Sequence, residues 1–346
     1  MENAVSTTIQ PERILRELAE LWVSLGKDSE HGQASGVLRA CAMTLITIVE
    51  EAEDPSDVWS TMAALMPEHP SRAMVIRVRE SAARELASRV FSQCWMPFGH
   101  RRQICCEQIE ISASDASLPD LAAVVLPLTV ADLPVILWCR SARVFGLPDF
   151  SQIAKIAQKL LLDSASFPNS AEILVEIGRR SRAGQVLGDL AWTRITRIRE
   201  LISQIFESRN YLARLREVAE VKISFGGSVP PPAAYYLAAW LLDCLEGGGA
   251  HPRLSWEPAP DDPAGQLMRI ELTGGSDDGL HITICVSGDR ERPCGDVQID
   301  SLASHTVFPP DNDYVLLREE LSIPGRDPVY EKSLMRAVAL AAAENQ

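Results

Sequence analysis

The sequence has 346 residues, with 33 Lys+Arg against 47 Asp+Glu, and its formal net charge is −14 at pH 7. With 46% hydrophobic and 23% charged residues, it has the composition of a globular protein with a sizeable core, which excludes disorder, collagen and coiled coil. The acidic balance argues against general binding of nucleic acid or of an anionic membrane, because both need a basic surface.

The first part of the chain predicts alternating helices and strands. Apolar residues at helical spacing between Ile14 and Leu25 predict an amphipathic helix over 12–25. Short β-branched runs predict buried strands. The expected strands are 43–49, 73–78, 89–96, 103–112, 134–139 and 160–163, and the further helices are 55–66, 118–128, 148–159, 170–180 and 195–206. This alternation is typical of an α/β domain with a mainly parallel, Rossmann-like sheet between helix layers.

The second part predicts a different arrangement. A strong helix is expected over 233–245, and the glycines at 247–249 are a typical helix end. Consecutive strands with short Gly/Asp turns then predict an antiparallel sheet. The expected strands are 254–257, 267–272, 280–286 and 297–299, and a helix over 328–343 closes the chain. This half reads as a smaller α+β domain.

Charge and turn residues suggest where the two parts meet. Residues 1–215 carry 23 Lys+Arg and 26 Asp+Glu, whereas residues 216–346 carry 10 and 21. Most of the acidity is therefore in the second part. The segment 208–232 is also punctuated by glycines and prolines. We expect an α/β domain over 1–215 and an acidic α+β domain over 216–346.

Targeting signals and cysteines bear on the compartment. The first ten residues lack the features of a signal peptide, and no apolar run approaches the roughly 18 residues of a membrane span. We expect a cytoplasmic protein whose eight cysteines are mostly thiols. Cys285 and Cys294 flank a polar turn and could meet across a hairpin as a redox-sensitive pair. The alternative is two separate thiols.

Sequence motifs for catalysis or cofactor binding were not found. The chain has no G-x-G-x-x-G after a strand, no Walker A loop, no G-x-S-x-G and no H-E-x-x-H. Its six histidines are scattered, and no Cys/His set has the spacing of a structural zinc site. We therefore predict no catalytic residue, no cofactor and no metal.

A local cluster of arginines stands out against the acidic background. Its members are Arg179, Arg180, Arg182, Arg194, Arg197 and Arg199. Arginine suits recognition of carboxylate or phosphate, so this cluster could bind a sugar phosphate, RNA or an acidic partner. The alternative is a solvated helix face whose arginines pair, within the chain, with the acidic C-terminal half. Within it, the segment Asp189–Arg194 combines Trp and Arg, which dominate interface hot spots, although Trp192 could equally lie in the core.

Several short segments follow one another along the first two thirds of the chain. They are HPSR at 69–72, CCEQI at 105–109, LPL at 126–128 with DLPV at 132–135 and LW at 137–138, DLAWTR at 189–194, and RELI at 199–202. Together they resemble the glucose-6-phosphate dehydrogenase assembly protein family (OpcA). The resemblance is clear over about residues 35–210 and looser beyond, at 235–245 and 327–331. One departure is Cys139 and Ser141, where family members often carry Trp and Gly.

The resemblance implies a non-enzymatic accessory protein. It would bind the glucose-6-phosphate dehydrogenase oligomer and promote its active assembly in the oxidative pentose phosphate pathway, without nucleic acid or membrane. The partner-binding residues that we expect on this basis are Arg72, Trp138, Asp189, Trp192, Arg194 and Arg199. The alternative is an α/β enzyme that binds a sugar phosphate or nucleotide through the cluster from Arg179 to Arg199.

Overall fold

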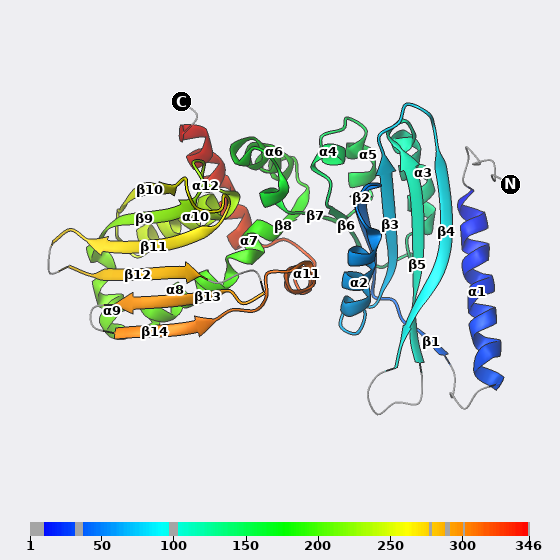
Figure 1. Ribbon diagram of the computed structural model, residues 1–346, viewed down its shortest axis with the longest axis horizontal. Coiled ribbons are helices and arrows are strands. Elements are labelled where there is room, and N and C mark those ends of the chain that lie inside the picture. The colour runs from blue at the N-terminus through cyan, green and yellow to red at the C-terminus, as the bar shows by residue number, and fades with distance from the viewer. Residues whose placement is uncertain are drawn as a thin grey trace. The chain divides into compact units, whose positions relative to one another are not determined.

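The computed structural model describes residues 10–31, 37–96, 103–276, 279–287, 291–299 and 302–344. The chain forms two compact units, Met1–Leu162 and Asp163–Gln346 (Figure 1). The boundary expected at 215/216 lies within the second unit, between helix α9 (Arg209–Arg214) and strand β9 (Val218–Gly226). As a boundary between folding units it stays a prediction.

A mainly parallel sheet forms the centre of the first unit. Its strands follow the order β1-β5-β3-β2-β6-β7, all parallel to their neighbours, and β4 pairs antiparallel with β5. The strands are β1 (Val37–Arg39), β2 (Met43–Glu50), β3 (Ser71–Arg79), β4 (Leu86–Trp95), β5 (Gln103–Ser114), β6 (Val135–Cys139) and β7 (Lys159–Leu162). This confirms the α/β, Rossmann-like prediction for this part of the chain.

Capping side chains and prolines set the ends of helices in the first unit. They are α1 (Pro11–His31), α2 (Pro55–Leu65), α3 (Leu118–Val125), α4 (Ala142–Phe145) and α5 (Phe150–Ala154). The Asp54 carboxylate accepts a 2.9 Å hydrogen bond from Ser56 N and caps α2, with Pro55 in the first turn. The helix expected over 118–128 ends at Val125, and one 3₁₀ turn containing Pro127 follows.

Central strands β2 and β3 hold the core of the first unit. Seven of the eight residues of β2 are buried, and Ile46, Ile48 and Val75 have no exposed surface. Side chains alternate between the two faces of a strand, so burial of successive residues means that both faces are covered. The continuous apolar runs in the sequence predicted this.

The second unit combines helices with a mixed sheet. The sheet order is β10-β9-β11-β12-β13-β14, with β9 and β10 parallel and the other pairs antiparallel. The strands of this sheet are β9, β10 (Arg253–Ala259), β11 (Leu267–Gly274), β12 (His281–Ser287), β13 (Cys294–Ile299) and β14 (Leu302–Val307). Strand β8 (Val186–Asp189) belongs to the second unit but lies outside this sheet. The helices are α6 (Ser170–Arg182), α7 (Leu190–Arg194), α8 (Thr196–Glu207), α9, α10 (Pro232–Gly247), α11 (Asp313–Leu321) and α12 (Pro328–Glu344).

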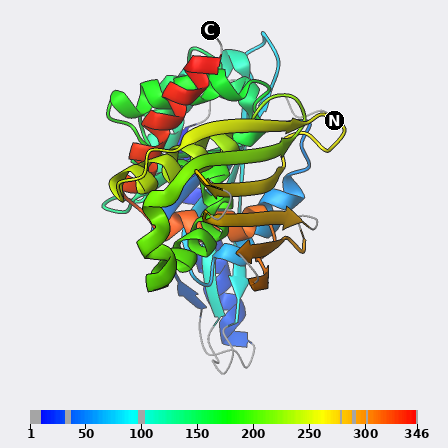
Figure 2. The same cartoon turned by 90° about the vertical axis from the view of Figure 1, so that its left-hand side faces the viewer.

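The sheet of the second unit has one buried and one open face. On β12, Ile282 and Ile284 are buried, whereas Thr283 and Cys285 point to the other face. Helix α10 contacts β9, and α12 packs against α10. Figure 2 shows the six strands lying side by side. The alternation on β12 therefore creates an accessible polar surface on this sheet.

Several elements of the second unit were not predicted, among them β9, β14 and α11. Strand β9 lies in the segment that the sequence suggested as a junction, where Gly226, its last residue, and Gly227 are turn signals. Its pairing partners, β10 and β11, come later in the chain. Strand β14 is largely exposed and helix α11 is weakly amphipathic, so neither produced a clear pattern.

Candidate functional site

The segment Asp189–Arg194 forms the end of β8 and the short helix α7. Asp189 caps this helix: its Oδ1 accepts hydrogen bonds from Ala191 N at 2.9 Å and Ser164 N at 3.0 Å. Its Oδ2 accepts a 2.8 Å hydrogen bond from Tyr236 Oη on α10. One carboxylate therefore holds three segments of the second unit together.

Asp189 is fully buried, and burial raises its pKa to about 6. The charge of Asp163 adds to the rise, and the hydrogen bonds from Ser164 and Tyr236 oppose it. Burial also raises the pKa of the Tyr236 hydroxyl well above its ordinary value. Tyr236 is therefore a neutral donor to this carboxylate near neutral pH.

Trp192 lies in the core beside this carboxylate. Its side chain is 3% exposed, and its ring lies 6.0 Å from that of Tyr236 and 5.8 Å from that of Tyr330. The Arg199 guanidinium lies 3.6 Å from the Trp192 ring centroid. This is the core placement that the sequence left open, so Trp192 positions its neighbours and is not a surface anchor in this structure.

Arg194 is held by two carboxylates. Its Nε lies 2.8 Å from Asp311 Oδ1, and its second terminal nitrogen lies 2.9 Å from Asp163 Oδ2. The side chain is 20% exposed. The arginine therefore joins α7 to the segment that precedes α6 and to the segment that precedes α11.

The arginine cluster is largely paired inside the chain. Arg179 and Arg180 both bind Glu176. Arg197 forms ion pairs with Glu200 and, at 3.8 Å, with Glu319. Arg194 is paired as above, and Arg199 lies on Trp192. Internal ion pairs are thus observed for four of these arginines, and a phosphate would have to displace their carboxylates. Two of the four, Arg194 and Arg197, pair with the acidic C-terminal half of the chain.

Arg72 and Trp138 belong to the first unit. The Arg72 side chain is 8% exposed; its Nε donates to Glu107 Oε2 at 2.5 Å and a terminal nitrogen donates to Leu128 O at 2.7 Å. Trp138 is 2% exposed on β6, with the Arg140 guanidinium 4.9 Å from its ring centroid. Both side chains are packed inside the unit, so a direct partner contact by either one stays a prediction.

Cys285 and Cys294 do not form the redox-sensitive pair, and the alternative of two separate thiols is observed. Cys285 and Cys294 are free. The hairpin of β12 and β13 does form, but its register sets Cys285 opposite Asp296 and Cys294 opposite Ser287. The two thiols are therefore out of register, and the redox pair is not present in this structure.

A different pair of cysteines is joined. Cys94 on β4 and Cys105 on β5 are directly opposite and form a disulfide with Cα atoms 4.0 Å apart. The neighbouring Cys106 is a buried thiol, and burial raises its pKa to about 11. Successive residues of a strand point to opposite faces, which agrees with these different fates. The sequence predicted the two strands but not the alignment of Cys94 with Cys105.

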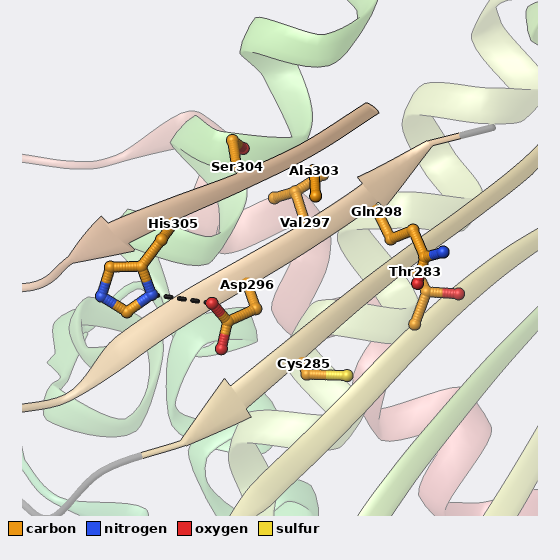
Figure 3. Close-up of a pocket in the computed structure, with 8 residues that line it drawn as sticks. All are labelled: Thr283, Cys285, Asp296, Val297, Gln298, Ala303, Ser304 and His305. Carbon is orange, nitrogen blue, oxygen red and sulfur yellow. Dashed lines mark hydrogen bonds and ion pairs between the residues drawn. The ribbon is translucent and has the colours of Figure 1, made fainter. Parts of the chain in front are cut away.

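The open face of the second sheet carries a depression of about 300 Å³. Cys285, Asp296 and His305 line it from three adjacent strands (Figure 3). His305 Nδ1 lies 2.7 Å from Asp296 Oδ1. No sequence pattern selects His305, because its partner Asp296 is on another strand. Cys294 belongs to the same cluster: ligand atoms of Cys294, Asp296 and His305 all lie within 4.8 Å of one another.

Two family models match this chain. One, described as the N-terminal domain of the glucose-6-phosphate dehydrogenase subunit, matches residues 62–179. The other, described as the C-terminal domain of that subunit, matches residues 185–334. Together the two models cover more than half of the chain, and the matched residues include parts of both compact units.

Two cyanobacterial relatives carry the provisional name OxPP cycle protein OpcA. The Nostoc punctiforme protein is 29% identical over 155 residues, which are 45% of this chain and 31% of that protein. The Synechococcus elongatus protein is 25% identical over 309 residues, 79% of this chain and 68% of that protein. The chain thus matches less than a third of the length of the Nostoc relative.

Among solved structures, glucose-6-phosphate 1-dehydrogenase from Mycobacterium avium is similar with a TM-score of 0.48 and 10% identity, covering 89% of this chain and 93% of that one. In the described part of the chain, no helix combines the length and the apolarity needed to cross a membrane.

Proposed function

The chain belongs to the OpcA family, and on that premise we propose that it binds glucose-6-phosphate dehydrogenase in the cytoplasm and promotes its active oligomer in the oxidative pentose phosphate pathway. The observation that carries this proposal is the match of two family models, both named after that dehydrogenase, to residues 62–179 and 185–334. The protein would act by binding, without catalysis of its own.

An activator of this kind must bind the competent state of its partner more tightly than the incompetent state. A coupling free energy of about 1–3 kcal/mol would tighten substrate binding by roughly 5- to 150-fold. The effect is therefore greatest at substrate concentrations below saturation. It disappears when substrate alone has already shifted the enzyme to its competent state.

We propose that the α7–α8 region of the second unit presents a partner-binding surface. Asp189 and Trp192 are buried and would act as positioning residues. Arg194 and Arg199 are partly exposed, and Arg197, with 41% of its side chain exposed, lies on the accessible side of α8. A rigid α7 would hold these arginines in place before the partner arrives, which lowers the entropic cost of binding.

The test uses glucose-6-phosphate dehydrogenase from the same organism. Its activity is measured at substrate well below KM while this protein is titrated. We expect a saturable rise in rate that vanishes at saturating substrate. No change in rate, together with no co-elution on a sizing column under reducing or oxidising conditions, would contradict the proposed function.

Matched variants test the surface separately from the function. Arg197→Glu reverses a charge on α8, and Arg179→Glu reverses an exposed charge on α6. We expect Arg197→Glu to raise the concentration of this protein needed for half-maximal activation, and Arg179→Glu to leave it unchanged. Equal effects of both variants would place the partner elsewhere while leaving the function intact.

A further inference from the structure

Three side chains that commonly bind metals meet on the open face of the second sheet. Cys294 and Asp296 are two residues apart on β13, so they point to the same face. His305 is directly opposite Asp296 on β14. Ligand atoms of all three lie within 4.8 Å of one another. The pairing of two strands, rather than any sequence spacing, brings them together.

We propose that Cys294, Asp296 and His305 bind one divalent transition-metal ion, with Zn²⁺ preferred. A thiolate, an imidazole and a carboxylate are all established zinc ligands. Mg²⁺ and Ca²⁺ favour sites made of oxygen atoms, so the thiol selects against them. Three protein ligands leave the fourth position of a tetrahedral ion to water. The proposal is independent of the role assigned to the chain in dehydrogenase assembly.

The distances are close to those that such an ion needs. Metal–ligand bonds of about 2.0–2.3 Å place the ligand atoms of a tetrahedral zinc site roughly 3.3–3.7 Å apart. His305 Nδ1 and Asp296 Oδ1 are 2.7 Å apart, so this distance would increase by about half an ångström when a metal binds. The Cys294 sulfur would move about 1 Å toward the other two ligands. Asp296 and His305 are more than half exposed, so their side chains can rotate without disturbing the core. The backbone already places all three.

Cys294 and Cys285, the two thiols on this face, differ in the groups that surround them. Cys285 lines the depression (Figure 3), but it is directly opposite Arg269 in the sheet. Cys294 Sγ instead lies 3.0 Å from Ser287 Oγ. A bound cation would be repelled by Arg269, so Cys294 is the thiol better placed to bind it. Cys285 becomes the natural control.

A metal at this site would fasten the edge of the sheet. Strand β14 ends the strand order and, among the residues that the structure describes, pairs with β13 alone. An ion held by His305 on β14 and by Cys294 and Asp296 on β13 would cross-link the two strands. Binding to the folded chain alone would also raise Tm with ion concentration, by mass action.

The test is a Co²⁺ titration of the full chain, freshly purified under argon without added thiol. We expect one equivalent to bind and to give an absorption band of thiolate-to-metal charge transfer, which Zn²⁺ abolishes by displacing Co²⁺. Cys294→Ser should remove the band. His305→Ala should weaken Co²⁺ binding by about tenfold or more.

Two control variants lie on the same face outside the cluster. They are Cys285→Ser and His281→Ala, the latter at an exposed histidine that hydrogen-bonds Thr283. Both should bind Co²⁺ as the natural chain does. The proposal is overturned if the natural chain binds no more tightly than Cys294→Ser, or if Cys285→Ser rather than Cys294→Ser loses the band.

Discussion

Tyr236 donates a 2.8 Å hydrogen bond to Asp189, and both side chains are fully buried. The bond joins helix α10 to the residue that begins α7. An isolated buried carboxylate is costly, and three hydrogen bonds offset that cost here. The segment singled out in the sequence is therefore a structural junction of the second unit.

Asp189 should make stability depend on pH in an unusual direction. Burial raises its pKa to about 6, from an ordinary value of 3.8, so the folded protein takes up this proton at a higher pH than the unfolded chain. The stabilisation is complete below about pH 4 and is lost as the pH rises through about 6, with a slope of at most about 1.4 kcal/mol per pH unit.

Denaturant unfolding of the natural chain and Asp189→Asn between pH 4 and 7 measures this effect. Because the variant lacks the titrating group, comparison with it cancels the other carboxylates. The free energy of unfolding of the natural chain minus that of the variant should fall across this range. A constant or rising difference would contradict the pKa shift.

Removing Arg194 should destabilise the chain strongly. Arg194→Met leaves Asp163 and Asp311 without their shared cation, and we expect a loss of about 3–5 kcal/mol in the free energy of unfolding. Arg197→Met removes a more exposed ion pair and should cost about 1 kcal/mol or less. Denaturation midpoints of the two variants, measured side by side, give the comparison; equal losses would mean that the Arg194 network contributes little.

The core placement of Trp192 predicts a graded series. Trp192→Ala should cost about 3–5 kcal/mol because it leaves a cavity beside Tyr236 and Tyr330. Trp192→Phe should cost less, since a ring remains. Arg199→Met keeps an apolar stem over the indole and should lose the cation–π contact and the hydrogen bond to Thr196, together about 1–3 kcal/mol. If Trp192→Ala unfolds as the natural chain does, the indole is not part of the core.

The disulfide predicts a thiol count. Protein purified in air and denatured without reductant should titrate six thiols, because Cys94 and Cys105 are joined and the other six cysteines are free. Reduction should raise the count to eight. As a control, the double variant Cys94→Ser/Cys105→Ser should titrate six thiols with or without reductant. Eight thiols in the unreduced natural chain would contradict the disulfide.

Runs of apolar residues in the sequence predicted the strands and helices whose burial depends on neighbouring residues in the chain. The buried strand β2 and the helix α10 were found because their apolar residues are continuous in sequence. The network around Arg194 could not be found in this way. Its partners Asp163 and Asp311 lie 31 and 117 residues away, so only the folded chain brings them together.

Register explains the remaining differences. The sequence identified the β12–β13 hairpin but not its alignment, and a shift of two residues separates Cys285 from Cys294. The same uncertainty hid the pairing of Cys94 with Cys105. The pairing of Asp296 with His305 was missed because strand β14 itself was not predicted. Cross-strand contacts depend on turn length and bulges, which residue types alone do not specify.

Sedimentation velocity measures whether this chain binds glucose-6-phosphate dehydrogenase and shifts its assembly. The dehydrogenase is held at a concentration where it partly dissociates, and this chain, fluorescently labelled, is added in steps. We predict that the label moves to the faster-sedimenting species and that the dehydrogenase shifts saturably toward its larger oligomer. A label that sediments alone at every ratio, with an unchanged dehydrogenase distribution, would contradict the account.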